Sequence, residues 1–127
     1  MIKVMIADDQ ELIRQSLQIV LSTHEDLKVV DAVENGFAVL ESIKKERPDV
    51  ILMDIMMPIM DGLTATKEIR SIKRDDAAQI PIIAMTANAF EEDAKKCFAV
   101  GMNAHLAKPF QIDKVEKTLV QCIHKSI

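Results

Sequence analysis

The chain has 127 residues and a formal net charge of −4, with 49% hydrophobic and 28% charged residues. This length and balance indicate one globular domain with a substantial core and exclude an intrinsically disordered chain. The acidic balance argues against a broad nucleic-acid-binding surface, and no apolar run is long enough to cross a bilayer.

The hydrophobic pattern predicts five strands that alternate with five helices. Short apolar runs bounded by polar residues predict the strands, and apolar residues three and four positions apart predict the helices. In chain order we expect a strand at 4–7, a helix at 9–23, a strand at 29–33, a helix that opens at 35–36 with Asn35 as its N-cap, a strand at 50–53, a helix at 63–72, a strand at 82–85, a helix at 90–100 that stops at Gly101, a strand at 104–107 and a helix at 112–124.

The stretch PDVILMDIMMPIMDG, residues 48–62, is central to this pattern. Its unbroken apolar run predicts a strand that is buried on both faces of a parallel sheet. The run ends on Asp54, and the proline and Asp-Gly pair that follow mark a loop and then the start of a helix. Alternating strands and helices imply right-handed crossovers, so we expect a single doubly wound α/β domain over residues 1–127.

Polar side chains follow four of the predicted strands. The first strand ends in Asp8 and Asp9, the third in Asp54, the fourth in Thr86 and the fifth in Lys108. Parallel strands bring these ends to one edge of the sheet, where three carboxylates would repel one another unless a cation offset their charge. Mg²⁺ prefers such oxygen ligands, and a lysine and a hydroxyl beside it suit phosphoryl transfer to a carboxylate nucleophile.

Each of these residues also has an ordinary structural explanation. Two acidic residues before a helix can simply complement its N-terminal dipole, and a lone lysine is usually solvated. Their coincidence at four separate strand ends favours a functional site.

Cys97 and Cys122 form no CxxC motif, and no His/Cys cluster has zinc spacing, so we expect reduced thiols in a cytoplasmic protein.

Over its whole length the chain resembles the receiver domain of response regulators in two-component signalling. The resemblance implies the flavodoxin-like strand order 2-1-3-4-5. The segments that carry it are IADD at 6–9, DVILMDIMMPIMDG at 49–62, IIAMTANA at 82–89 and GMNAHLAKPF at 101–110.

The resemblance also implies a role for each acidic residue. Asp54 corresponds to the phosphoacceptor. Asp9 and Asp54 would ligate Mg²⁺ together with the backbone carbonyl of Met56, while Asp8 would act mainly through water. The acidic edge would thus be a magnesium site.

The remaining predicted site residues would bind the phosphoryl group and take part in the conformational switch that follows phosphorylation. Thr86 would be the switch hydroxyl and Lys108 would pair with the phosphoryl group, next to a cis peptide bond at Lys108-Pro109. The chain departs from the family at His105, where a Tyr or Phe is usual. This difference leaves the site chemistry intact and puts the output switch in question.

As a receiver, the chain would accept a phosphoryl group from a histidine kinase or a histidine phosphotransfer protein. It would then change a protein-binding face formed by the fourth helix, fifth strand and fifth helix. We expect no enzymatic activity beyond weak self-catalysed phosphorylation and dephosphorylation, and no direct binding of nucleic acid or membrane. The output protein is unknown, and a phosphorylation-dependent dimer is an open alternative.

The sequence also allows other classes of protein to be compared with a receiver. A haloacid-dehalogenase-type phosphatase needs a second Asp two residues after the first, where this chain has Met56. A flavodoxin needs a Ser/Thr/Gly-rich phosphate loop after the first strand, where Asp8 and Asp9 would repel the phosphate. A docking or dimerisation module that works without phosphorylation would not need the full site. Because the last predicted helix ends the chain, we expect no DNA-binding domain, whether the receiver stands alone or belongs to a longer regulator or hybrid kinase.

Overall fold

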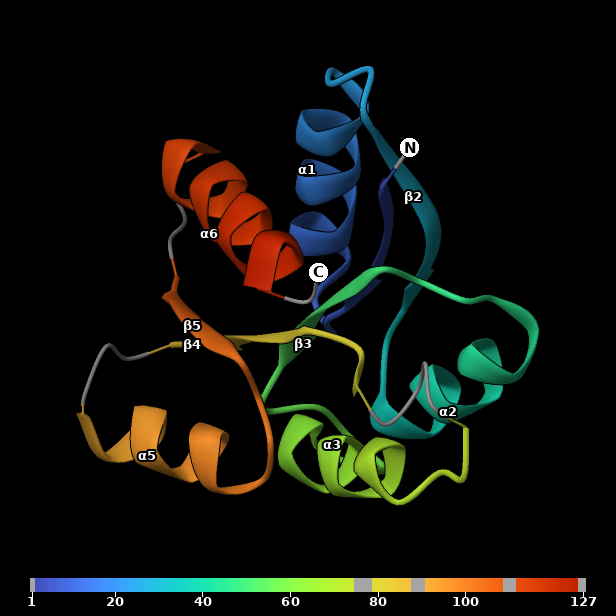
Figure 1. The fold of residues 1–127 in the computed structure, drawn as a ribbon, viewed down its shortest axis with the longest axis vertical. Helices are drawn as coiled ribbons and strands as arrows, with labels where there is room; N and C mark the ends of the chain where they lie inside the picture. Colours follow the sequence, from blue (N-terminus) through green and yellow to red (C-terminus); the bar gives the residue numbers. More distant parts are fainter. Residues whose placement is uncertain (1, 75–78, 88–90, 109–111, 126–127) are drawn as a thin grey trace.

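A computed structural model describes residues 2–74, 79–87, 91–108 and 112–125 (Figure 1). Strands and helices alternate along the chain as the hydrophobic pattern predicts. The elements are β1 (Ile2–Ala7), α1 (Glu11–Ser22), β2 (Leu27–Val33), α2 (Gly36–Lys45), β3 (Val50–Asp54), α3 (Gly62–Arg70), β4 (Ile82–Thr86), α5 (Glu91–Ala99), β5 (Ala104–Ala107) and α6 (Ile112–Lys125).

The strands form one parallel sheet in the order β2-β1-β3-β4-β5, which confirms the strand order that the resemblance implied. Figure 1 shows α1 and α6 on one side of the sheet and α2, α3 and α5 on the other. The doubly wound architecture with five helices in the described residues is therefore confirmed. No helix in this part of the chain combines the length and apolarity needed to span a bilayer.

Alternate residues of each central strand pack into two separate cores. In β3, Val50 and Leu52 face the core under α1 and α6, whereas Ile51 and Met53 face the core under α2, α3 and α5. A strand of a sheet covered on both faces needs apolar residues at every position, which explains the unbroken run. The helices contribute Leu17, Leu21, Val115 and Leu119 to the first core and Val39, Ile43, Ala65, Ile69 and Cys97 to the second.

Two predicted helix boundaries have the expected local chemistry. The Asn35 side chain accepts a hydrogen bond from the Ala38 N–H at 2.7 Å, which caps α2 as predicted. Gly101 has a φ of +105° after α5, and the next N–H, of Met102, donates to the Cys97 carbonyl at 3.1 Å. This arrangement is the predicted glycine C-cap.

The predicted starts of β1 and β2 are two residues too late, and the predicted start of α1 is two residues too early. Pairing of Ile2 with Leu27 and of Lys3 with Lys28 extends both strands toward their N-termini. Helix α1 begins at Glu11 because the Asp8 carboxylate accepts a hydrogen bond from the Gln10 N–H at 2.9 Å, which holds the preceding segment in a turn.

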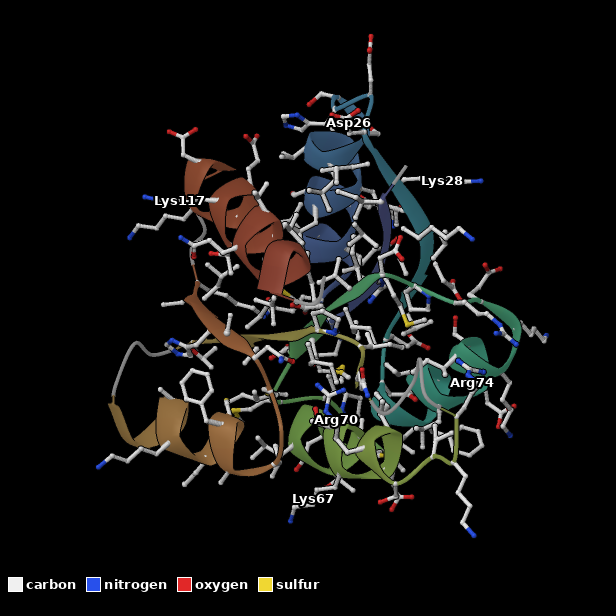
Figure 2. The ribbon with its side chains drawn as sticks, in the orientation of Figure 1. Asp26, Lys28, Lys67, Arg70, Arg74 and Lys117 are labelled. Carbon is white, nitrogen blue, oxygen red and sulfur yellow. The ribbon has the colours of Figure 1, made fainter. Side chains whose placement is uncertain are left out.

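Arg70 ties the end of α3 to the turn between α5 and β5, and in Figure 2 its side chain lies between α3 and the sheet. Its guanidinium donates to the Gly101 carbonyl at 2.7 Å and to Asn103 Oδ1 at 2.9 Å. Asn103 Oδ1 in turn accepts from the Ile82 N–H at the start of β4. The end of the sheet opposite the acidic edge is thus fixed by side-chain hydrogen bonds.

Candidate functional site

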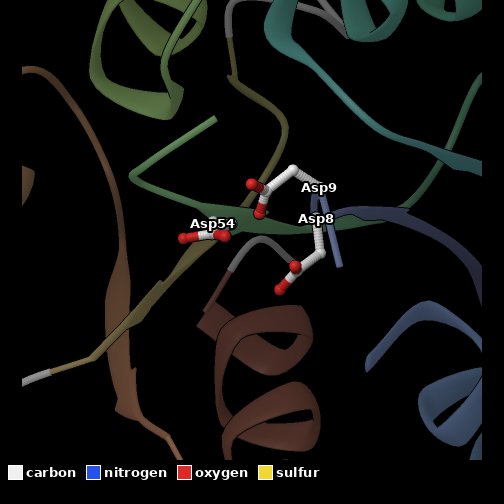
Figure 3. Close-up of side chains that lie close together, drawn as sticks. All are labelled: Asp8, Asp9 and Asp54. Carbon is white, nitrogen blue, oxygen red and sulfur yellow. The ribbon is translucent and has the colours of Figure 1, made fainter. Parts of the chain in front are cut away.

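Three carboxylates gather at the carboxyl edge of the sheet (Figure 3). Asp8 and Asp9 follow β1, and Asp54 is the last residue of β3. One oxygen from each lies within 4.8 Å of the others. Asp8 and Asp54 are buried, while Asp9 is exposed. The structure therefore brings together the three acidic residues that the strand-end argument selected.

The backbone around Asp54 leaves little room for movement. Strand β3 is paired on both sides, with β1 and β4, and the Met56 N–H donates to Asp54 Oδ1 at 3.1 Å. Gly62 passes so close that a Cβ there would lie 2.2 Å from the Asp54 carbonyl oxygen. Only glycine allows this approach, which holds the start of α3 against the end of β3.

Asp8 is held by its own turn and by α1. Its Oδ1 accepts the Gln10 N–H, and its backbone carbonyl accepts a hydrogen bond from Arg14 Nη1 at 2.7 Å. Its Oδ2 is buried and lies 2.7 Å from Lys108 Nζ in an ion pair. The carboxylate thus keeps a fixed orientation toward the site.

Lys108 bridges two of the carboxylates. Its Nζ lies 2.7 Å from Asp8 Oδ2 and 3.2 Å from Asp54 Oδ2, and its backbone N–H donates to the Thr86 carbonyl at 2.7 Å. Burial lowers the pKa of the amine, but the contacts with Asp8 and Asp54 outweigh it and leave the pKa above its ordinary value. Lys108 is therefore a permanent positive charge at neutral pH.

Burial raises the pKa of Asp54 from 3.8 to about 6, and the negative charge of Asp8 adds to the increase. The hydrogen bond from the Met56 N–H and the nearby Lys108 act in the opposite direction. A carboxylate that ionises near pH 6 is largely deprotonated at neutral pH and is a stronger base than an exposed Asp. Such a group suits the role of nucleophile.

The donor set fits a hard divalent cation. All three groups are carboxylates, and the buried Asp8 Oδ2 has a charged neighbour in Lys108 but no partner with hydrogen-bond geometry among the described residues. Crowding of negative charge at one edge would be relieved by a cation, and Mg²⁺ prefers oxygen ligands. These three carboxylates therefore have the chemistry needed to hold such a cation.

Thr86 is the last residue of β4, and His105 is the second residue of the adjacent strand β5. Thr86 is buried, and its Oγ1 lies 2.9 Å from His105 Nε2. Which atom donates depends on the tautomer of the ring. The hydroxyl that was predicted to meet the phosphoryl group is thus bonded to the histidine that replaces the usual aromatic residue.

The structure brings the predicted site residues together at the carboxyl edge of the sheet, with His105 joined to them through Thr86. The roles assigned to these residues remain predictions. The Met56 N–H contacts Asp54, but the role of the Met56 carbonyl as a ligand is not tested. Pro109 lies outside the described residues, and so does the predicted cis peptide bond. Sequence reasoning missed Arg14 as a support for Asp8, because an arginine in the first turns of a helix gives no signal of this contact.

Comparison with known proteins supports the resemblance to receiver domains. The family model described as the response regulator receiver domain matches residues 4–120. A probable histidine kinase 1 of Oryza sativa subsp. indica is 32% identical over an alignment of 149 positions, which covers 94% of this chain but 15% of the kinase. The chemotaxis protein CheY of Halobacterium salinarum is 38% identical over 109 residues, 86% of each chain.

A solved structure matches at the level of the fold. It is the receiver domain of a sensor histidine kinase from Pseudomonas aeruginosa PAO1, with a magnesium ion coordinated in its active-site cleft. The two share 33% identity and a TM-score of 0.85, over 96% of this chain and 97% of the other. The chain thus spans nearly all of a receiver domain but only a small part of a whole histidine kinase.

Proposed function

Because this chain belongs to the response regulator receiver domain family of two-component signalling, we propose that it accepts a phosphoryl group on Asp54. The observation that carries this proposal is the buried carboxylate at the end of β3, with Lys108 Nζ 3.2 Å from its Oδ2 and a pKa raised to about 6. We further propose that residues 1–127 form one receiver domain.

In this mechanism the Asp54 carboxylate attacks the phosphorus of a phosphorylated histidine on a kinase or a phosphotransfer protein. A bond forms between an Asp54 oxygen and phosphorus, the phosphorus–nitrogen bond breaks, and the imidazole leaves with a proton. Lys108 lies where it can neutralise an oxygen of the transferred group. The protein contributes mainly position and charge, which is how phosphoryl transfer is generally catalysed.

Asp8, Asp9 and Asp54 would hold Mg²⁺, with the Met56 carbonyl as a further ligand. The ion would supply positive charge for the phosphoryl oxygens. Lys108 would keep its place when Asp54 is modified, because its shorter contact is to Asp8.

The signal would leave the site through Thr86. A phosphoryl oxygen would compete with His105 for the Thr86 hydroxyl, 2.9 Å from the ring nitrogen in this structure. Breaking that contact would free the His105 side chain on β5 and alter the face formed by α5, β5 and α6. An output protein of unknown identity, or a second copy of the chain in a phosphorylation-dependent dimer, would bind there.

The test is the intact mass of the protein after incubation with acetyl phosphate and Mg²⁺. Wild type should gain one phosphoryl group, and Asp54→Asn should gain none. Asp61→Asn is the matched control, because Asp61 is an acidic residue of the same loop that caps α3 and should leave the modification unchanged. Normal phosphorylation of Asp54→Asn would mean that another residue is the phosphoacceptor, whereas wild type that gains no phosphoryl group would favour a docking module that works without phosphorylation.

A further inference from the structure

The thioether of Met56 is exposed beside the phosphoacceptor. The residue is 72% exposed, although its backbone N–H is bonded to Asp54 Oδ1. Together with Asp9 and Asp61, Met56 lines an open groove next to the acidic cluster. A chemical change of this side chain would therefore take place at the edge of the site.

Met56 differs in this respect from the other described methionines. Met60 is half-buried, packed against the core below α2 and α3. The rest are buried, with exposed fractions of 0% for Met5, Met53 and Met85, 4% for Met102 and 9% for Met57. Because oxidation of methionine follows its exposure, a mild oxidant should react at Met56 first among the described methionines.

We propose that Met56 is a site of reversible oxidation by hydrogen peroxide that shortens the life of the phosphorylated state. The sulfur lone pair attacks one peroxide oxygen, the O–O bond breaks and, after proton transfer, water leaves. Sulfur loses two electrons and becomes a sulfoxide, while the peroxide is reduced. A methionine sulfoxide reductase reverses the step with electrons from a dithiol, which becomes a disulfide as the sulfoxide oxygen leaves as water.

The consequence rests on the proposed function. In the reduced protein Met56 lines the groove beside Asp9 with a thioether, which is only a weak hydrogen-bond acceptor. A sulfoxide oxygen at the same place accepts hydrogen bonds and can hold a water molecule near the phosphoryl group. Attack by that water forms a new oxygen–phosphorus bond and breaks the bond to Asp54, which releases inorganic phosphate and restores the carboxylate.

The experiment has two readouts. Purified protein is treated with a low dose of hydrogen peroxide, and peptide mapping by mass spectrometry locates the added oxygen. The treated and untreated proteins are then phosphorylated with acetyl phosphate and Mg²⁺, and loss of the phosphoryl group is followed after the donor is removed. Sulfoxide should appear at Met56 first, and the half-life should fall about threefold to tenfold, less than the effect of a full general base.

Variants separate this effect from general damage. Met56→Leu keeps the volume without an oxidisable sulfur, so its half-life should not respond to peroxide. Met56→Gln supplies a polar acceptor and should shorten the half-life without peroxide. Treatment of the oxidised wild type with a methionine sulfoxide reductase and a dithiol should restore the original half-life.

Equal oxidation of buried methionines and Met56, an unchanged half-life after Met56 oxidation, or the same loss in Met56→Leu would each overturn the proposal. Failure of untreated wild type to gain a phosphoryl group is a different result, because it would contradict the proposed function. The peptide map decides the site of oxidation in either case.

Discussion

At the scale of single residues, the site depends on keeping an ionisable carboxyl group in a place where ionisation is costly. Asp54 is buried next to Asp8, and both share the charge of Lys108. The raised pKa of Asp54 therefore corresponds to a free-energy cost of its ionisation in the folded state, a cost that the proposed role as phosphoacceptor would require.

Asp54→Asn should stabilise the metal-free protein at neutral pH. The folded-state pKa of about 6 exceeds the unfolded value of 3.8, so this group destabilises the fold as pH rises from about 4 to 6. A difference of about two pKa units corresponds to roughly 3 kcal/mol at most. Urea unfolding with a chelator should therefore find the variant more stable by about 2 kcal/mol near pH 7.5 and similar to wild type below about pH 4. A difference in unfolding free energy between the variant and wild type that stays constant across this pH range would mean that Asp54 titrates normally.

His105→Phe should favour the activated conformation. The Thr86 hydroxyl is bonded to the ring nitrogen of His105, so capture of that hydroxyl by a phosphoryl oxygen costs a hydrogen bond of about 1 kcal/mol in the wild type only. Phenylalanine has no such bond to lose, and the equilibrium should shift about fivefold toward the activated state.

NMR of the helix α5 amides with beryllofluoride, a mimic of the phosphoryl group, measures that shift. His105→Gln is the control, because its amide can keep a bond to Thr86 and should resemble wild type. Identical spectra for all three proteins would mean that His105 only packs and that the switch lies elsewhere.

At the scale of elements, the loop between β3 and α3 carries backbone strain next to the site. Ile59 has a φ of +68° and is 84% exposed, and the Met60 N–H donates to the Pro58 carbonyl at 2.7 Å across it. A β-branched residue in this turn costs conformational free energy, and because the side chain is exposed its packing offsets little of that cost. The Met60 carbonyl then accepts the Gly36 N–H at 2.8 Å, which joins the loop to the start of α2.

Ile59→Gly should raise the free energy of unfolding by about 0.5 to 1 kcal/mol, because relief of the left-handed conformation exceeds the entropy cost of glycine. Chemical denaturation measures the change. Ile59→Val keeps the branched Cβ and should leave the stability near that of wild type. Destabilisation by glycine would show that contacts of the Ile59 side chain outweigh the strain.

At the scale of the whole molecule, the proposed binding of Mg²⁺ at this site would be coupled to folding. A cation that binds the native state alone stabilises it by about 1.4 kcal/mol at roughly ten times its Kd. The melting temperature of wild type should therefore rise with Mg²⁺, and that of Asp9→Ala should hardly change. Asp26→Ala is the control, since this exposed carboxylate lies in the turn between α1 and β2 (Figure 2) and should leave the Mg²⁺ response intact. Equal shifts in wild type and Asp9→Ala would exclude this site as the source.

Most of the architecture could be predicted because it depends on repeated patterns. Short, mainly apolar runs indicated all five strands, and the polar residues after four of them converge at one edge because parallel strands share their direction. What the sequence could not supply depends on contacts between distant segments. The pairing that extends β1 and β2, the left-handed turn at Ile59 and the bond between Thr86 and His105 all arise from tertiary structure.

Chemical mapping of the phosphorylated residue tests the central claim most directly. Borohydride reduces an aspartyl phosphate to homoserine, so the protein is phosphorylated with acetyl phosphate and Mg²⁺, reduced, digested and sequenced by mass spectrometry. Homoserine should replace Asp54, and Asp8 and Asp9 should remain aspartate. Homoserine at Asp8 or Asp9, or at no position despite a measured phosphoryl adduct, would contradict the assignment of Asp54 as the phosphoacceptor.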